Sequence, residues 1–135
     1  MFGSPNKTIP AVGPEFGAVN VMLDPPLIEA LHRRGFEIAI ETNGTILPPA
    51  GVDWVCVSPK AGAELVVTSG DELKIVVPQP GLDPLQFAHL DFRRFSVQPM
   101  DSPDRVRNTE WAIRFCLAHP QWQLSLQTHK VTGIR

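Results

Sequence analysis

The stretch Phe36-Glu37-Ile38-Ala39-Ile40-Glu41-Thr42-Asn43-Gly44 decides the fold of this 135-residue chain. Its first five residues are mostly apolar and predict a strand, and its last three predict the turn that ends it. Residues 24–35, just before it, predict a helix with Asp24 as its N-cap and Gly35 as its stop. A helix that leads directly into a strand is typical of a layered α/β fold.

Helices and strands continue to alternate toward the C-terminus. Each expected strand is short and rich in β-branched residues, as strands of a mostly buried sheet are. Together they predict an α/β fold with a largely parallel sheet. The expected elements are strands at 53–57, 73–77, 95–97 and 122–126, a short extended piece at 64–67, a turn at 69–71, a helix from 83 to 90, and a helix that Asn108 caps and that ends near His119.

Composition restricts the class of protein. The chain has 43% hydrophobic and 19% charged residues, which is typical of one globular domain. A net charge of −2 argues against a nucleic-acid binder, and the sequence holds no apolar run long enough for a membrane span. The first residues lack a secretion signal, so a cytoplasmic protein is expected. We predict an irregular lead-in at 1–21 and the domain itself at 22–135.

Cysteine and histidine are too scattered to form a metal site by sequence motif. Cys56 and Cys116 lie far apart, and the four histidines do not cluster with them. Neither a zinc site nor an iron–sulfur site is therefore expected. Both cysteines are interpreted as reduced and buried. The hydrophobic patterns around Trp54, Trp111 and Trp122 place all three tryptophans in the core.

Polar clusters follow four of the strands directly. In a parallel sheet the carboxyl ends of the strands share one edge, where ligands commonly bind. Turn residues alone would account for one such loop, but four in series favour a ligand site. The clusters are Glu41-Thr42-Asn43-Gly44, Ser58-Pro59-Lys60, Gln98-Pro99-Met100-Asp101 and Gln127-Thr128-His129-Lys130.

Single residues in these clusters admit two readings each. Glu41 could accept two N–H groups from a guanidine-like or pterin-like ring edge, or be a solvated turn carboxylate. Lys60 could hold an anionic group or lie at the surface. His129 could donate to a substrate or carry a proton, or be structural. Met100 could contact a ligand or pack in the core.

The clusters and strands in this order closely resemble the C-terminal part of 7-carboxy-7-deazaguanine synthase, a radical S-adenosylmethionine enzyme of queuosine biosynthesis. The resemblance covers residues 22–135. It rests on Glu-Thr-Asn-Gly-Thr at 41–45, Trp-Val-Cys-Val-Ser-Pro-Lys at 54–60, Glu-Leu-Lys-Ile-Val at 72–76, Gln-Pro-Met-Asp at 98–101 and Trp-Gln-Leu-Ser-Leu-Gln-Thr-His-Lys at 122–130.

The resemblance implies an incomplete (β/α) barrel that converts 6-carboxy-5,6,7,8-tetrahydropterin to 7-carboxy-7-deazaguanine with loss of ammonia. It also implies a [4Fe-4S] cluster, S-adenosylmethionine and magnesium. Glu41, His129 and the C-terminal carboxylate of Arg135 would contact the pterin. The residues expected at S-adenosylmethionine are Ser58, Pro59, Lys60, Gln98, Pro99, Met100 and Asp101.

The chain departs from the family at its N-terminal end. Neither cysteine lies in the three-cysteine cluster motif, the Gly-Gly-Glu-Pro motif is replaced by residues 15–20, and the magnesium threonine is missing. No catalytic or metal-binding residue is therefore assigned. We expect a truncated form that is inactive alone and binds only a small-molecule substrate. The alternative is a non-catalytic module that binds S-adenosylmethionine or a pterin, or that self-associates as a homo-dimer through an exposed sheet edge.

Overall fold

In the described part of the chain six parallel strands form one sheet, and strands that follow one another in the sequence are neighbours in it. This singly wound order is that of a (β/α) barrel. The computed structural model describes residues 7–10 and 23–133. The elements are β1 (Lys7–Pro10), α1 (Pro25–Arg33), β2 (Phe36–Thr42), β3 (Trp54–Val57), β4 (Ser69–Val77), the 3-10 turn η1 (Pro84–Phe87), β5 (Asp91–Pro99), α2 (Arg105–Ala118), β6 (Trp122–Leu124) and α3 (Thr128–Thr132).

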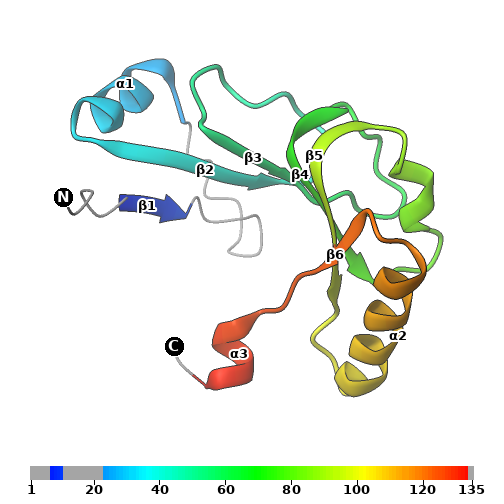
Figure 1. The fold of residues 1–135 in the computed structure, drawn as a ribbon. Coiled ribbons are helices and arrows are strands. Elements are labelled where there is room, and N and C mark those ends of the chain that lie inside the picture. Colours follow the sequence, from blue (N-terminus) through cyan, green and yellow to red (C-terminus); the bar gives the residue numbers. More distant parts are fainter. Residues whose placement is uncertain (1–6, 11–22, 134–135) are drawn as a thin grey trace.

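The sheet is curved, with α1 beside β2 and α2 against β5 and β6 (Figure 1). Its covered face is apolar and carries the core, because alternate residues of each strand point to the same side. Leu73, Ile75 and Val97 are fully buried there. Ala112 of α2 and Trp122 of β6 belong to the same hydrophobic cluster. The opposite face carries polar side chains, which are described with the site.

The expected helix at 24–35 is confirmed. The Asp24 carboxylate accepts a hydrogen bond from the amide of Leu27 at 2.9 Å, as an N-cap does. Gly35 follows the helix with a φ of 78°, a left-handed conformation that glycine adopts without strain. The strands at 36–40 and 53–57 are also present, as β2 and β3.

Strands β4 and β5 are longer than the sequence indicates. The turn expected at 69–71 is wrong, because these residues begin β4 and pair with the start of β5. Asp71 is fixed there by the amide of Val55, which donates to its carboxylate at 2.8 Å, and by Arg93 at 3.3 Å. The piece at 64–67 is not assigned to a strand. The strand expected at 95–97 extends in both directions to Asp91–Pro99.

Helix boundaries also differ from those expected. The helix expected from 83 to 90 is a single 3-10 turn, η1. Helix α2 begins at Arg105, three residues before its expected cap, so Asn108 lies inside it and is buried. Trp111 is not a core residue, since it is 42% exposed and stacks on Phe115 at the surface. Trp122 is buried as expected.

The two ends of the domain bring further differences. Residues 7–10, within the lead-in expected to be irregular, form β1 beside β2. Residues 1–6 and 11–22 lie outside the described residues. Strand β6 ends at Leu124 rather than Leu126, and α3 follows it where a loop was expected. None of the helices in the described part is long and apolar enough to cross a membrane.

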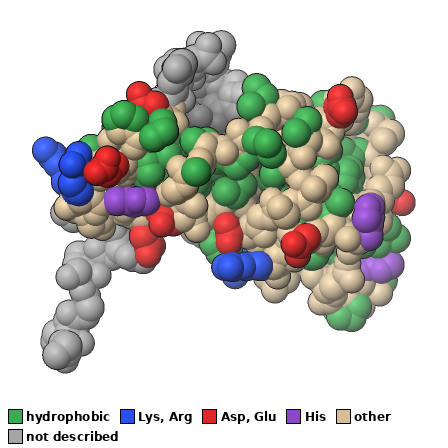
Figure 2. Space-filling view, turned by 90° about the horizontal axis from the view of Figure 1, so that it is seen from above, with side chains coloured by type: hydrophobic (Ala, Val, Ile, Leu, Met, Phe, Trp, Pro, Cys, Tyr) green, Lys and Arg blue, Asp and Glu red, His purple; other side chains and the backbone are tan. Residues whose placement is uncertain are grey.

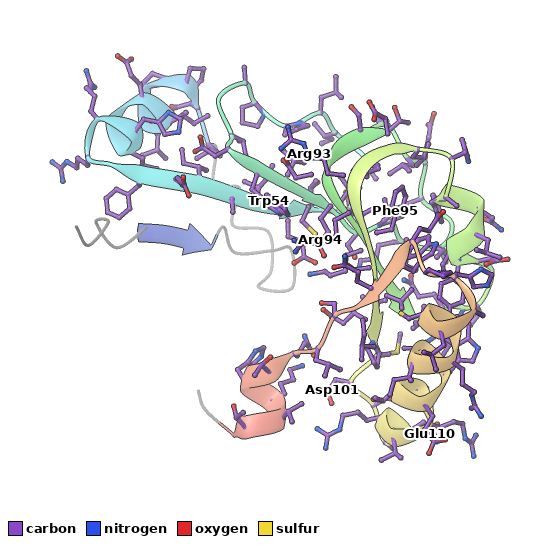
Figure 3. The ribbon with its side chains drawn as sticks, viewed as in Figure 1. Trp54, Arg93, Arg94, Phe95, Asp101 and Glu110 are labelled. Atoms are coloured by element: carbon purple, nitrogen blue, oxygen red, sulfur yellow. The ribbon has the colours of Figure 1, made fainter. Side chains whose placement is uncertain are left out.

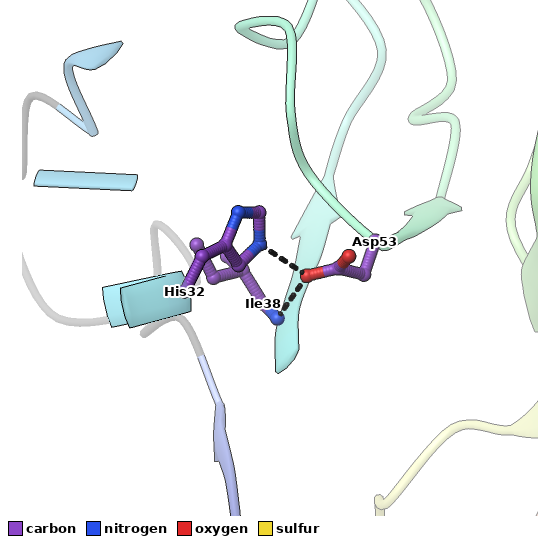
Figure 4. Close-up of polar contacts among 3 residues, drawn as sticks. All are labelled: His32, Ile38 and Asp53. Carbon is purple, nitrogen blue, oxygen red and sulfur yellow. Dashed lines mark hydrogen bonds and ion pairs between the residues drawn. The ribbon is translucent and has the colours of Figure 1, made fainter. Parts of the chain in front are cut away.

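A hydrogen-bonded pair joins α1 to the start of β3 (Figure 4). His32 Nε2 donates to Asp53 Oδ2 at 2.8 Å, and the Ile38 amide donates to the same oxygen at 2.7 Å. The Ile38 hydrogen bond and His32 hold the pKa of Asp53 below its ordinary value. The pair ties α1 to β2 and to the start of β3, at the opposite ends of the strands from the polar clusters.

Candidate functional site at the carboxyl edge of the sheet

The four predicted clusters follow strand ends at one edge of the sheet, since all the strands are parallel. Backbone hydrogen bonds continue the pairing beyond the strands and bring successive loops together. The Ser58 amide donates to the Thr42 carbonyl at 2.7 Å, and the Met100 amide donates to the Val77 carbonyl at 2.7 Å. The Ser125 amide donates to the Val97 carbonyl at 2.9 Å. The prediction of one shared edge is thus confirmed in backbone terms.

A polar strip crosses the face of the sheet opposite α2, just below this edge. We define it as Glu41, Cys56, Glu72, Lys74 and Ser96. The register places Glu41 beside Cys56 and Cys56 beside Glu72, with Lys74 beside Ser96. Lys74 Nζ donates to Glu41 Oε2 at 2.8 Å, and Ser96 Oγ donates to Glu72 Oε1 at 2.6 Å. Side-chain hydrogen bonds of the strip therefore link β4 to β2 and to β5, and Cys56 of β3 lies between them in the register.

Burial within the strip affects its proton affinities. Burial alone would lower the pKa of Lys74, but the hydrogen bond to Glu41 and nearby negative charges outweigh it and raise that pKa. Burial raises the pKa of the Cys56 thiol to about 12. At neutral pH the strip thus holds an ammonium ion next to a neutral thiol, and Cys56 is not a nucleophile.

The Ser58-Pro59-Lys60 segment offers one buried and one exposed polar group. Ser58 is 2% exposed, and its hydroxyl has no hydrogen-bond partner among the described residues. A buried hydroxyl without a partner costs free energy, so a ligand that bonds to it would be favoured there. Pro59 is buried, whereas Lys60 is exposed.

The Asn43-Gly44 turn ties two loops of the edge together. Gly44 has a φ of 79°, and a Cβ atom there would lie 2.5 Å from Leu65 Cδ1. Its carbonyl accepts hydrogen bonds from the amides of Val66 and Val67 at 2.8 and 3.0 Å. Only glycine suits this position, because any side chain would collide with the β3–β4 loop.

The Gln98–Asp101 cluster lies partly on β5 and partly after it. Gln98 is half-buried and Pro99 is buried at the strand end, and Met100 is half-buried. Asn108 of α2 holds the segment, because its Nδ2 donates to the Met100 carbonyl at 3.1 Å. Asp101 lies between α3 and the start of α2 (Figure 3). Lys130 Nζ pairs with Asp101 Oδ2 at 2.9 Å, and this hydrogen bond lowers the pKa of Asp101.

A pocket of about 260 Å³ opens between the end of β5, the start of α2 and α3. Its wall is mainly apolar, with Leu126 and Val131 from the C-terminal segment. Polar groups stand around it, as in sites that take an apolar ring with a polar periphery. The lining residues are Pro99, Asp101, Arg105, Thr109, Leu126, Gln127, Lys130 and Val131.

The predicted substrate contacts are only partly assembled. Glu41 ends β2 and belongs to the polar strip. His129 is exposed on α3, and it is the neighbouring Lys130 that contacts Asp101. Arg135 lies outside the described residues. The role of each in ligand binding stays a prediction.

The sequence analysis missed three polar residues of the site: Glu72, Lys74 and Ser96. Each lies in the middle of a strand rather than in a loop after one. A signal was present, because Glu72 and Lys74 alternate with buried Leu73 and Ile75. That alternation indicates a strand with one polar face, which is where the lining of a barrel lies.

The residues present do not fit an iron–sulfur cluster or a metal ion. Within the described ranges no three His, Cys, Asp or Glu side chains are grouped to hold a metal. Cys56 faces the polar side of the sheet, whereas Cys116 belongs to the helix that covers the apolar side. Two thiols on opposite sides of a sheet cannot share one cluster.

Parallel strands in sequential order, with polar loops and a pocket at their carboxyl ends, define part of a (β/α) barrel. Comparison with known proteins shows which family of (β/α) barrels the chain resembles. The chain is 62% identical over 114 residues to the 7-carboxy-7-deazaguanine synthase of Caulobacter vibrioides, covering 84% of this chain and 54% of that protein. For the synthase of Bradyrhizobium diazoefficiens the identity is 59%, covering 85% and 55%. A search against protein-family models finds no match.

Comparison with solved structures leads to the same family. The crystal structure of QueE from Escherichia coli matches with a TM-score of 0.54 and 32% identity, over 76% of this chain and 49% of that one. The chain is thus related to the 7-carboxy-7-deazaguanine synthases, and the match fits their C-terminal part. The expected fold, part of an incomplete radical S-adenosylmethionine barrel, is confirmed. The chain spans about half the length of the curated relatives it matches.

Proposed function

We propose that these 135 residues carry the part of a 7-carboxy-7-deazaguanine synthase site that faces 6-carboxytetrahydropterin and S-adenosylmethionine. The observation that carries the proposal is the shared carboxyl edge, where an ion pair holds Glu41 and the buried Ser58 hydroxyl has no hydrogen-bond partner among the described residues. Identity of 59–62% to synthases over this same region supports it.

The pterin contacts in this proposal begin with Glu41. Its Oε2 accepts from Lys74, and within the described part of the chain Oε1 accepts no hydrogen bond. A carboxylate has about four acceptor sites, so Glu41 retains the capacity to accept N–H groups from an aminopyrimidinone edge. His129 and the Arg135 carboxylate would add contacts from the C-terminal segment.

The S-adenosylmethionine contacts come from two loops. Ser58 and Lys60 follow β3, and Gln98 to Asp101 end β5. The pocket beside Asp101, with its apolar wall, suits an adenine ring and its ribose hydroxyls. In the family, bound S-adenosylmethionine supplies the radical that starts the reaction.

No radical step is assigned to these residues. The chain has two cysteines, and they lie on opposite sides of the sheet, so three cluster thiolates cannot be assembled from it. We therefore propose that the 135-residue chain binds ligands but does not catalyse the reaction by itself. Catalysis would need thiolate ligands for the cluster from outside these residues.

Calorimetry with the 135-residue chain tests ligand binding, with S-adenosylmethionine and pterin-6-carboxylate as separate probes. Glu41→Gln should weaken binding of the pterin about tenfold, because one charge-assisted acceptor is lost. Lys60→Ala should weaken binding of S-adenosylmethionine about threefold, a small effect because Lys60 is exposed. Arg33→Met, which removes an exposed ion pair on α1, is the control and should change neither. Absence of heat with both probes would overturn the proposal.

Anaerobic iron–sulfide reconstitution tests the second half of the proposal. The expected result is no stoichiometric visible absorption from a [4Fe-4S] cluster and no product from the pterin. A stoichiometric cluster signal would show that thiolates other than a family-type triad suffice.

A further inference from the structure

The proposed function leaves one charged group of the site unexplained. Lys74 lies in the middle of β4, two strands away from Glu41, and its side chain is only 14% exposed. Holding an ammonium ion in such a place is costly unless it is paired. Arg94, which pairs with Glu72 in the β4–β5 register, lies 5.6 Å from the centre of the Trp54 ring, and both residues are labelled in Figure 3.

The register explains how Lys74 reaches Glu41. Cys56 lies between them on β3, paired with Glu41 on one side and with Glu72 on the other. Cysteine is small, and its thiol is neutral at physiological pH, so it neither blocks nor competes for the ammonium group. Lys74 therefore passes over Cys56 and makes a 2.8 Å contact with Glu41 Oε2.

A second hydrogen bond holds the other carboxylate of the strip. Glu72 is on the same face of β4 as Lys74. Its Oε1 accepts a 2.6 Å hydrogen bond from the Ser96 hydroxyl on β5. Ser96 is 2% exposed, so this contact is shielded from water. One carboxylate of the strip is thus bonded to a serine, and the other to a lysine.

Glu41 itself is 46% exposed at its side chain. An exposed glutamate at the end of a strand samples several rotamers, and ordering it costs conformational entropy when a ligand binds. The contact with Lys74 fixes one carboxylate oxygen before any ligand arrives. The other oxygen stays accessible at the carboxyl edge.

From these contacts we infer that Lys74 is a positioning residue, which holds the Glu41 carboxylate in one orientation so that Oε1 is presented to the aminopyrimidinone edge of the substrate. The inference rests on the proposed function for its ligand. The structural part of the inference, that Lys74 fixes the orientation of the Glu41 side chain, can be tested without a ligand.

The structural half is tested without ligand by NMR. Three-bond couplings to Cγ of Glu41 should report a single χ1 rotamer in the 135-residue chain and rotamer averaging in Lys74→Met. Lys74→Arg should keep the single rotamer, since a guanidinium also pairs with a carboxylate. Arg33→Met should leave Glu41 unchanged. Averaging already present in the unmodified chain, or a single rotamer retained in Lys74→Met, would overturn the inference.

The binding half uses pterin-6-carboxylate and a double-mutant cycle. Lys74→Met should weaken binding about tenfold, and Lys74→Arg should recover most of it. If Lys74 acts through Glu41, the double variant Glu41→Gln/Lys74→Met should bind no more weakly than Glu41→Gln alone. Additive losses would show a role independent of Glu41 and refute the inference. If the unmodified chain binds no pterin, the proposed function fails, and the rotamer measurement still decides the role of Lys74.

Discussion

Replacing Asn108 by alanine tests whether the loop after β5 is held from α2. Asn108 is 6% exposed, and its Nδ2 donates to the Met100 carbonyl at 3.1 Å and to Ser102 Oγ at 3.2 Å. Losing a buried group that serves two acceptors costs about 1–3 kcal/mol. Alanine regains about 0.5 kcal/mol of helix propensity. The free energy of unfolding should therefore fall by about 0.5–2.5 kcal/mol.

Urea unfolding measures this change, and Thr109→Ala is the matched control. The Thr109 hydroxyl donates to the Arg105 carbonyl at 2.8 Å within the same helix, so its removal should change stability by less than about 0.5 kcal/mol. Hydrogen exchange of the Met100 amide, which donates to the Val77 carbonyl, should accelerate in Asn108→Ala and not in the control. An Asn108→Ala variant as stable as the control would refute the assigned role of the side chain.

Three further results are expected. Gly44→Ala should lower the free energy of unfolding by about 2–4 kcal/mol in urea titrations, because its φ is positive and the new Cβ would lie 2.5 Å from Leu65; a neutral change would contradict the close approach. The folded pKa of Asp53 is lowered, so its stabilisation is present above the ordinary carboxyl value of about 4 and is lost as pH falls through the folded pKa. The difference in free energy of unfolding between the unmodified chain and Asp53→Asn should thus become smaller as the pH is lowered in a series of urea titrations. A difference that grows on acidification would refute this. Cys56 should not react with a thiol reagent at pH 8 in the folded chain, because burial raises its pKa to about 12; rapid reaction of two thiols would contradict its burial.

Local chemistry made part of the fold predictable. The helix at 24–35 was found because its start and stop depend on Asp24 and Gly35, whose preferences act within a few residues. The start of β4 was missed for the opposite reason. Ser69-Gly70-Asp71 has the composition of a turn, but pairing with Asp91 and Phe92 imposes an extended conformation.

Asn108 illustrates how a residue type can mislead. Asparagine favours helix caps because its side chain bonds to nearby backbone. Here it bonds to backbone and a hydroxyl eight and six residues earlier, from inside the helix. The sequence pattern contains no information about that loop's position.

In the candidate site, too, some features could be predicted from the sequence and others could not. Its loops could be located from sequence because each follows a strand, and parallel strands end at one edge. The partner of Glu41 could not, because Lys74 is 33 residues away and the contact depends on the strand register. Charge distribution is similarly a property of the fold. On the face seen in Figure 2, the Lys and Arg side chains lie at separated places and form no continuous basic patch.

The Gly44 turn has a consequence for how ligands would influence one another. Its carbonyl accepts hydrogen bonds from the amides of Val66 and Val67, so the chain after Glu41 is bonded directly to the chain after Lys60. A ligand that stiffens one of these loops lowers the entropic cost of binding at the other. Thermodynamic linkage then requires each ligand to strengthen the binding of the other by the same factor. The turn would thus make the two halves of the site cooperative without any change of shape.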